Sequence, residues 1–233
     1  MNNHNFEAAD KRFEPVHQSR TFNRILNSLN LGDKKMLDLG CGYGEYLVRF
    51  GKNSLGITST IEEVEYGKAR NIRIIRGNVE LIDSLGLQER FEGIWANNLF
   101  EHLLSPHAFL MKLKTVAEDT TVLVLGVPVV PRIASLMKLK KFRGALASAH
   151  TNFFTRETLQ LTVLRAGWNV KDIRPFTFKN VLLDRLFSFF APHLYIVAYN
   201  DTKFIYPEKK LKEWKDESLY QDLLKIGNRG NAR

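Results

Sequence analysis

Apolar residues recur at two different spacings along this chain, and the spacing changes from segment to segment. Short runs rich in Val, Ile and Leu are typical of buried strands, whereas apolar residues at every third or fourth position are typical of helices. The strand-like runs lie at 36–39, 54–58, 72–75, 91–97, 121–127, 170–173 and 194–199, and the helical patterns lie at 17–29, 61–69, 107–116 and 155–166. Strands and helices therefore alternate from residue 36 to residue 127, which predicts a parallel sheet with right-handed crossovers.

Residues with strong local preferences mark several of these boundaries. Pro106 suits the first turn of the helix that follows it. Thr155 can cap a helix that Gly167 would end. A further helical pattern, from Glu45 to Phe50, begins directly after a glycine-rich segment. We therefore expect a strand, a tight turn and a helix in that order at this point of the chain.

The segment 36–44, Met-Leu-Asp-Leu-Gly-Cys-Gly-Tyr-Gly, contains the chemistry that narrows function most. An apolar run that carries Asp38 is followed by glycines at alternate positions. A strand, a tight turn and a helix start allow backbone N–H groups to approach a nucleotide-like ligand. Glycine is needed in such a turn because a Cβ atom would block the ligand or forbid a positive φ.

Two neighbouring carboxylates indicate which ligand this loop would accept. The third glycine of the dinucleotide pattern GxGxxG would fall at position 45, which is Glu45 here. Asp38 and Glu45 would repel a pyrophosphate but attract a cation. No GK[ST] sequence follows the loop, which excludes a phosphate-cradling triphosphate site. The loop therefore favours a nucleoside that carries positive charge.

Composition and charge set broader limits. The chain has 233 residues, of which 44% are hydrophobic and 25% charged, as in ordinary globular proteins. Its one cysteine, Cys41, excludes an intrachain disulfide and favours a reducing compartment; a small residue in a tight turn is a simpler interpretation of it than a nucleophile. The N-terminus has no apolar signal core, so we expect a cytoplasmic protein. The net charge of +9 suggests acidic partners or serves solubility.

Four motifs in order resemble those of the class I S-adenosylmethionine-dependent methyltransferases, in particular the group that acts on small molecules, quinones and glycan or lipid precursors. They are Leu-Asp-Leu-Gly-Cys-Gly-Tyr-Gly (37–44), Gly-Ile-Thr (56–58), Gly-Asn-Val-Glu (77–80) and Ile-Trp-Ala-Asn-Asn-Leu-Phe-Glu-His (94–102). The resemblance implies an α/β fold: a Rossmann-like, doubly wound seven-stranded sheet, mostly parallel with a reversed last strand and helices on both faces. It also implies S-adenosylmethionine as cofactor.

The same resemblance implies a division of the chain. Residues 1–34 would form a helical segment over the active site, 35–200 the methyltransferase domain with a basic insertion at 131–149, and 201–233 a charged extension. The extension is read as a helix followed by a frayed tail.

The resemblance also assigns the cofactor to particular residues. Asp38 would balance the ammonium group of the cofactor, and Gly40 and Gly42 would allow its close approach. The N–H groups of this loop, which includes Cys41 and Tyr43, would face the cofactor's carboxylate or ribose.

Two positions depart from the commonest pattern of that family. Thr58 replaces an acidic residue, and we expect Thr58 and Glu63 to share the ribose; alternatively, Thr58 only favours the strand and Glu63 is a solvated helix residue. Asn78 replaces an aspartate. Its carbonyl oxygen would accept from the adenine amino group, with the Val79 N–H near a ring nitrogen, unless Asn78 is simply a turn residue.

The motif that ends the fourth strand bears on the acceptor. Asn97 lies at the carboxyl edge of the sheet, where open α/β sheets bind ligands. The sequence Asn-Asn-Leu-Phe lacks the Pro-Pro of nucleic-acid amino methylases, which counts against DNA as a substrate. His102, beside Glu101, could act as a general base or could hold the loop by a backbone hydrogen bond. Positioning alone can support methyl transfer, so a base is not required.

Two segments outside the sheet rhythm are candidates for contact with the acceptor or a partner. The insertion 131–149 mixes apolar residues with cations and has no acidic residue; it suits a helix on anionic lipid, a lid over a phosphorylated acceptor, or an ordinary solvated helix. The apolar segment 181–192 would line a hydrophobic acceptor site or, as we favour, pack in the core. Further candidate lining residues are Arg12, Phe13, His17, 132–150 and 152–154.

The sequence therefore predicts O-methylation of a small-molecule or lipid- or glycan-linked acceptor, by a cytoplasmic protein that can also touch an anionic membrane surface through 131–149. Two other functions stay open. The protein could methylate RNA or protein, or it could be a methyltransferase-like partner subunit without turnover. No metal site is expected.

Overall fold

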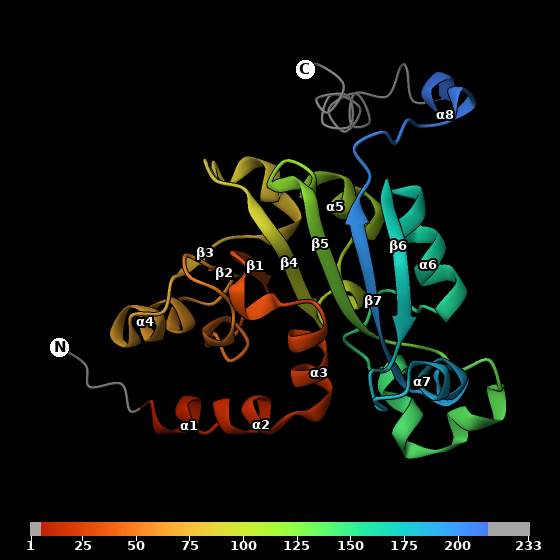
Figure 1. Ribbon diagram of the computed structural model, residues 1–233, viewed down its shortest axis with the longest axis horizontal. Helices are drawn as coiled ribbons and strands as arrows, with labels where there is room; N and C mark the ends of the chain where they lie inside the picture. The colour runs from red at the N-terminus through yellow and green to blue at the C-terminus, as the bar shows by residue number, and fades with distance from the viewer. Residues whose placement is uncertain (1–5, 214–233) are drawn as a thin grey trace.

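The protein folds around a seven-stranded sheet in the computed structural model, which describes residues 6–213 (Figure 1). The strand order is β3-β2-β1-β4-β5-β7-β6. The strands are β1 Met36–Leu39, β2 Leu55–Thr58, β3 Ile74–Arg76, β4 Phe91–Asn97, β5 Ala117–Pro128, β6 Trp168–Arg174 and β7 His193–Asn200. The first five strands run parallel, and β7 lies antiparallel between β5 and β6. The predicted fold class, with its reversed last strand, is confirmed.

Helices flank both faces of this sheet. The α-helices are α1 Glu7–Asp10, α2 Phe13–Gln18, α3 Arg20–Ser28, α4 Ile61–Arg70, α5 Pro106–Leu113, α6 Arg156–Arg165, α7 Val181–Phe187 and α8 Glu208–Glu213. The 3₁₀ helices are η1 Leu31–Asp33, η2 Leu47–Arg49, η3 Val79–Ser84, η4 Phe100–His102, η5 Ala134–Lys138, η6 Lys140–Leu146 and η7 Ser188–Phe190. Pro106 occupies the first turn of α5, and Thr155 caps α6, as the sequence predicts.

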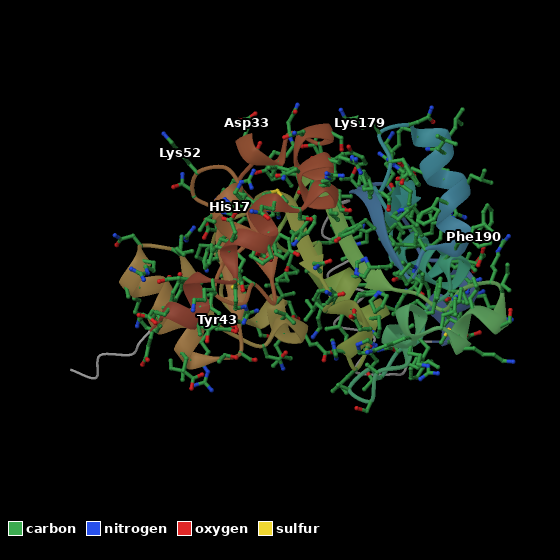
Figure 2. All side chains as sticks on the ribbon, turned by 90° about the horizontal axis from the view of Figure 1, so that it is seen from below. His17, Asp33, Tyr43, Lys52, Lys179 and Phe190 are labelled. Carbon is green, nitrogen blue, oxygen red and sulfur yellow. The ribbon has the colours of Figure 1, made fainter. Side chains whose placement is uncertain are left out.

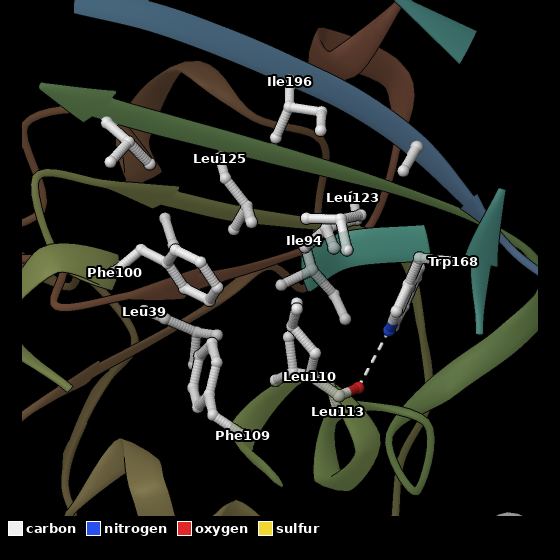
Figure 3. Packing of buried hydrophobic residues seen from close by; sticks show 14 of the residues in the cluster. Leu39, Ile94, Phe100, Phe109, Leu110, Leu113, Leu123, Leu125, Trp168 and Ile196 are labelled. Carbon is white, nitrogen blue, oxygen red and sulfur yellow. Dashed lines mark hydrogen bonds between the residues drawn. The ribbon is translucent and has the colours of Figure 1, made fainter. Parts of the chain in front are cut away.

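The alternation of side chains along each strand builds a core on each face. On β4, Ile94 belongs to the cluster that packs against α5 and α6, and Trp95 belongs to the cluster that packs against α3. Figure 3 shows the first cluster, in which Trp168 Nε1 donates a hydrogen bond of 2.8 Å to the Leu110 carbonyl. The sheet is therefore buried on both faces, which leaves its edge as the place for a ligand.

All five parallel strands point their carboxyl ends toward one end of the molecule, the lower end in Figure 1. The helices α1, α2 and α3 lie at this end on one side, and α7 with the 131–149 segment lies there on the other (Figure 1). The site is therefore to be sought between an N-terminal cover and the insertions that follow β5 and β6.

The helix predicted at 45–50 is wrong; this segment contains only the short 3₁₀ helix η2. The chain must return quickly to the start of β1, where the Gly51 N–H donates to the Lys34 carbonyl at 2.9 Å. A longer α-helix would not cover that distance in so few residues. The predicted helix at 17–29 also divides, because Ser19 is extended and its hydroxyl accepts from the Phe22 N–H as the cap of α3.

The structures predicted for 131–149 and for 181–192 both need correction. The segment 131–149 forms two 3₁₀ helices rather than one amphipathic helix. The segment 181–192, which we favoured as core, is an exposed helix: Leu182 is 75% exposed and Leu186 is 62% exposed. The buried residue of α7 is Asp184, which binds the Arg174 guanidinium and the Thr177 N–H. A polar anchor therefore holds the helix and leaves its leucines outside.

Of the predicted extension 201–233, the structure describes 201–213, which include α8, and 214–233 lie outside the described residues. Among residues 6–213, no helix combines the length and the apolar character that crossing a bilayer would require.

Candidate functional site

The glycine loop after β1 adopts a backbone that needs glycine. Gly40, Gly42 and Gly44 have φ angles of +69°, +57° and +93°. A Cβ atom at Gly42 would lie 2.8 Å from a carboxylate oxygen of Glu45, and one at Gly40 would lie 3.3 Å from the Leu99 side chain. The loop therefore leaves open, at its surface, space that any larger residue would fill.

That space is one side of a cavity of about 420 Å³ at the carboxyl edge of the sheet. Its size falls in the range typical of small-molecule sites. The lining comes from the N-terminal cover, the glycine loop and the end of β4: Arg12, Pro15, Val16, Asp38, Gly40, Cys41, Gly42, Glu45, Tyr46, Trp95, Asn97 and Asn98. Figure 2 views this edge from below, with α2, which carries His17, lying over it. Segments distant in sequence thus enclose one site.

Asp38 is the more deeply buried of the two acidic residues in this lining. Its side chain is 1% exposed, and its Oδ2 atom has no hydrogen-bond partner among the described residues. Burial, with the negative charge of Glu45 nearby, raises the pKa of Asp38 well above the usual range. The cation in the lining, Arg12, pairs with Glu45 at 2.6 Å instead. The carboxylate of Asp38 is thus left for a cationic ligand, and an ammonium group would supply the missing partner.

The polar groups at the end of β4 face the same cavity. Asn97 Nδ2 donates to the Tyr46 hydroxyl at 3.2 Å, while Asn97 Oδ1 and Trp95 Nε1 are buried and have no partner among residues 6–213. Asn97 therefore lies where the sequence places it. Tyr46 was not predicted, because it falls in a segment that we interpreted only as helical.

The expectation that the N–H groups of the glycine loop face the cofactor is wrong for two of them. Gly40 N and Cys41 N both donate to the Ile57 carbonyl, at 2.9 and 3.1 Å, so these two groups do not face a ligand. The Cys41 thiol packs in the core, and burial raises its pKa, which fits the small-residue interpretation. Tyr43 packs its ring on Tyr66, 5.2 Å between centroids, outside the cavity lining.

The residues predicted to bind ribose and adenine lie at the end of β2 and in the segments that follow β2 and β3. Thr58 ends β2, and its hydroxyl donates to a Glu63 carboxylate oxygen, so the structure brings this pair together. Asn78 Oδ1 accepts from the Glu80 N–H at 3.0 Å and caps η3, which begins at Val79. This contact matches the turn interpretation of Asn78. None of these four residues lines the cavity around Asp38, and their cofactor roles stay predictions.

Glu101 and His102 lie in η4, beyond the lining of that cavity. The Nδ1 atom of His102 lies 3.0 Å from the Ala149 carbonyl, the backbone contact that the structural alternative predicts. A second histidine, His193, was missed by sequence reasoning because a lone histidine at the start of a strand forms no pattern. Its Nε2 lies 3.0 Å from Asn98 Oδ1, and burial lowers the pKa of His193 to about 4.

The other candidate lining residues separate into two groups. Arg12 lines the cavity, whereas Phe13 packs on Tyr66 and His17 is exposed outside the lining. Asn152 Nδ2 donates to the Leu103 carbonyl at 2.6 Å, and Phe154 stacks on Phe100. These last contacts are structural and tie the insertion after β5 to η4.

A family profile described as a methyltransferase domain matches residues 9–173, most of the chain. This chain belongs to the methyltransferase-domain family. The match begins in the N-terminal cover and extends through the glycine loop, β4 and β6, so it includes every residue of the cavity lining.

Curated relatives of this methyltransferase are similar over shorter stretches. (S)-Coclaurine N-methyltransferase of Papaver somniferum is 32% identical over 96 residues, which cover 37% of this chain and 27% of that protein. Ubiquinone biosynthesis O-methyltransferase of Rhodopseudomonas palustris (strain TIE-1) is 29% identical over 115 residues, which cover 46% of this chain and 45% of that protein. The chain therefore spans less than half the length of these two relatives.

Solved structures share the fold over most of the chain. An S-adenosylmethionine-dependent methyltransferase from Clostridium acetobutylicum superimposes with a TM-score of 0.61 at 10% identity, covering 84% of this chain and 98% of that one. Another, from Archaeoglobus fulgidus, has a TM-score of 0.54 at 18% identity and covers 84% and 100%. Family and fold agree on S-adenosylmethionine as the cofactor, and the unpartnered carboxylate of Asp38 fits the ammonium group of that molecule.

Proposed function

We propose that this methyltransferase moves a methyl group from S-adenosylmethionine to an oxygen atom of a small-molecule or lipid- or glycan-linked acceptor. The observation that carries the proposal is the buried Asp38 carboxylate in the cavity beside the glycine loop. Asp38 would hold the amine of the donor, and the cavity wall made by Tyr46, Asn97 and Asn98 would orient the reacting end. Holding the acceptor oxygen in line with the sulfonium supplies most of the catalysis in such a site.

Two observations support oxygen as the acceptor atom. The longer of the two curated matches described above is to a protein named as an O-methyltransferase. His102 also suits a group that takes a hydroxyl proton. A carbonyl only accepts, so the Nδ1 atom of His102 donates to the Ala149 carbonyl, and Nε2 is the nitrogen that could accept the proton.

An exposed apolar and basic surface supports a lipid-linked acceptor. We call the α7 helix, η7 and the segment 131–149 the insertion surface. Its two parts touch, because the Arg132 guanidinium lies 5.1 Å from the Phe189 ring centre. Its exposed side chains include large apolar residues and cations, among them Leu139, Leu146, Leu182, Leu183, Leu186, Phe190, Lys138, Lys140 and Arg143. Figure 2 shows Phe190 at this side of the molecule. Apolar groups among cations are typical of contact with anionic membranes.

The function is tested with S-adenosylmethionine labelled in its methyl group. We expect label in a lipid or small-molecule fraction when the protein is given hydroxylated aromatic compounds or a lipid extract. Label found in RNA or in protein alone would support the other enzyme functions and contradict the proposal. Binding of S-adenosylhomocysteine without product from any acceptor class would support a partner subunit.

The membrane contact has its own test by vesicle sedimentation. We expect the protein to bind vesicles of phosphatidylglycerol and phosphatidylcholine, and Leu182→Asp with Leu186→Asp to weaken this binding at least tenfold, because each substitution places a charge in the interface. Leu161→Asp, at a 46% exposed position on α6, is the matched control and should bind as wild type does. Equal loss in the control, or equal binding to vesicles without the anionic lipid, would exclude contact through the insertion surface.

A further inference from the structure

Three side chains from two distant segments converge outside the cavity lining. They are Glu101 and His102 of η4 and His150, which follows the 131–149 insertion. The Nε2 atom of each histidine lies 3.9 Å from Glu101 Oε1. The donor atoms of all three residues lie within 4.8 Å of one another. The sequence does not reveal this cluster, because His150 lies far along the chain from Glu101.

The hydrogen bonds of the two histidines fix which nitrogen is free. His102 Nδ1 lies 3.0 Å from the Ala149 carbonyl, and His150 Nδ1 lies 3.3 Å from the Ala145 carbonyl. A carbonyl oxygen accepts and cannot donate, so both Nδ1 atoms carry a proton, and Nε2 is the nitrogen through which each ring can bind a metal ion. Imidazoles oriented in this way by a backbone carbonyl are typical metal ligands.

Glu101 supplies the carboxyl group at the centre. Its side chain is 1% exposed, and its Oε2 atom is buried without a hydrogen-bond partner among residues 6–213. Three possible ligand atoms thus face one another across distances of at most 4.8 Å. A proton could join only one pair, and 3.9 Å is too long for that hydrogen bond. A metal ion about 2.0–2.2 Å from each ligand atom would join all three.

We infer that Glu101, His102 and His150 form a binding site for one divalent metal ion of the Zn²⁺ type. Ligands of a tetrahedral ion lie roughly 3.3–3.6 Å apart, so donor atoms that are separated by 3.9 Å, and by at most 4.8 Å, in this structure must approach one another by roughly 0.3–1.5 Å. Two imidazoles and one carboxylate select a borderline transition metal over Mg²⁺ or Ca²⁺, which prefer oxygen ligands.

The position of the site suggests what the ion does. Three protein ligands leave a fourth position open. His102 is 39% exposed, so this position can reach solvent. Leu99, three residues before His102, has its side chain beside Gly40 of the cofactor loop. An acceptor hydroxyl on the ion would lose its proton more readily, and His102 would then act as a ligand rather than as the base. This role rests on the proposed function, whereas binding of the ion does not.

The test is calorimetric titration of ZnCl₂ into tag-free full-length protein that has been dialysed against a chelator. We expect one ion per chain in the wild type. His102→Ala, His150→Ala and Glu101→Gln should each weaken binding at least tenfold, because each removes a ligand. His17→Ala, an exposed histidine outside the cluster, is the control and should bind zinc as the wild type does.

Binding of S-adenosylhomocysteine is measured on the same variants to show that each still folds. Loss of zinc binding with retained S-adenosylhomocysteine binding supports the site, whether or not methyl transfer is detected. No saturable binding of one ion to the wild type, or binding that both histidine variants keep unchanged, would overturn it.

Discussion

Asp38→Asn is expected to weaken binding of S-adenosylhomocysteine by a factor between about 30 and a few thousand. Loss of one partner of a buried charged pair costs about 2–5 kcal/mol, because the other charge stays buried and unpaired. Here that other charge is the ammonium group of the ligand. Asparagine keeps the size of the side chain, so the loss reports charge rather than shape. Isothermal titration calorimetry measures it directly.

The same substitution should stabilise the protein when no ligand is bound. Burial and the nearby Glu45 raise the pKa of Asp38, so the folded protein holds this proton more tightly than the unfolded chain does. The stability that Asp38 contributes is present at acidic pH and is lost as the pH rises through its raised native pKa. Above the pKa of the unfolded chain this titration is therefore a cost to folding, and asparagine, which does not titrate, removes it. Urea unfolding at pH 5 and pH 8 should show a smaller loss of stability with pH in the variant.

Asp33→Asn is the matched control for both measurements. Asp33 is exposed in η1, outside the cavity lining, and loses the same charge. We expect wild-type affinity and nearly wild-type stability. If Asp38→Asn binds S-adenosylhomocysteine as tightly as wild type does, Asp38 does not hold the amine of the cofactor. If the variant without ligand is less stable than wild type, the claim that the Asp38 carboxyl group lacks a partner in the protein is wrong.

Gly42→Ala is expected to lower affinity for S-adenosylhomocysteine at least tenfold and also to destabilise the fold. The backbone at Gly42 has a φ of +57°, and an added Cβ would lie 2.8 Å from a Glu45 oxygen. Moving Glu45 would break its pair with Arg12 and narrow the cavity at the loop. The unfavourable backbone adds about 1–2 kcal/mol of lost stability. Calorimetry and urea unfolding report the two effects separately.

Gly86→Ala separates backbone strain from closure of the cavity. Gly86 has a similar φ of +68°, but an added Cβ would meet nothing within 4 Å. We expect it to lose a comparable 1–2 kcal/mol of stability while ligand affinity stays unchanged. If Gly86→Ala weakens the affinity as much as Gly42→Ala does, the loop conformation does not form the binding surface.

The sheet could be predicted because burial on both faces leaves a clear pattern. The run from Phe91 to Asn97 places Ile94 and Trp95 on opposite faces, and its predicted limits match β4. Strand ends depend on pairing partners rather than on local residues, so β5 begins at Ala117, earlier than the run starting at Thr121 predicts. Local propensity is a weak guide where tertiary contacts decide.

The cofactor side of the site was predictable because one short segment carries it. Asp38 and the glycines that follow it lie in the end of β1 and the turn directly after it. The apolar spacing of 45–50 could not reveal that this segment lacks an α-helix. The chain returns early there to pair with Lys34, just before β1.

The region that we propose for the acceptor was less predictable, because it is assembled from distant segments. His150 meets Glu101 only through hydrogen bonds between the insertion and η4, such as Thr151 N to the Glu101 carbonyl. Asp184 reverses the expected orientation of α7 by pairing with Arg174, so an apolar segment faces outward. Neither arrangement has a periodic signal in the sequence.

The most direct test of the account compares two ligands on two proteins. S-Adenosylhomocysteine and its analogue without the amino group are titrated into wild type and Asp38→Asn by calorimetry, which isolates the coupling between the carboxylate and the ammonium. The account predicts that the wild type prefers S-adenosylhomocysteine by at least 30-fold and that the variant shows little preference. Equal preference in both proteins would show that the amine of the cofactor does not lie at Asp38.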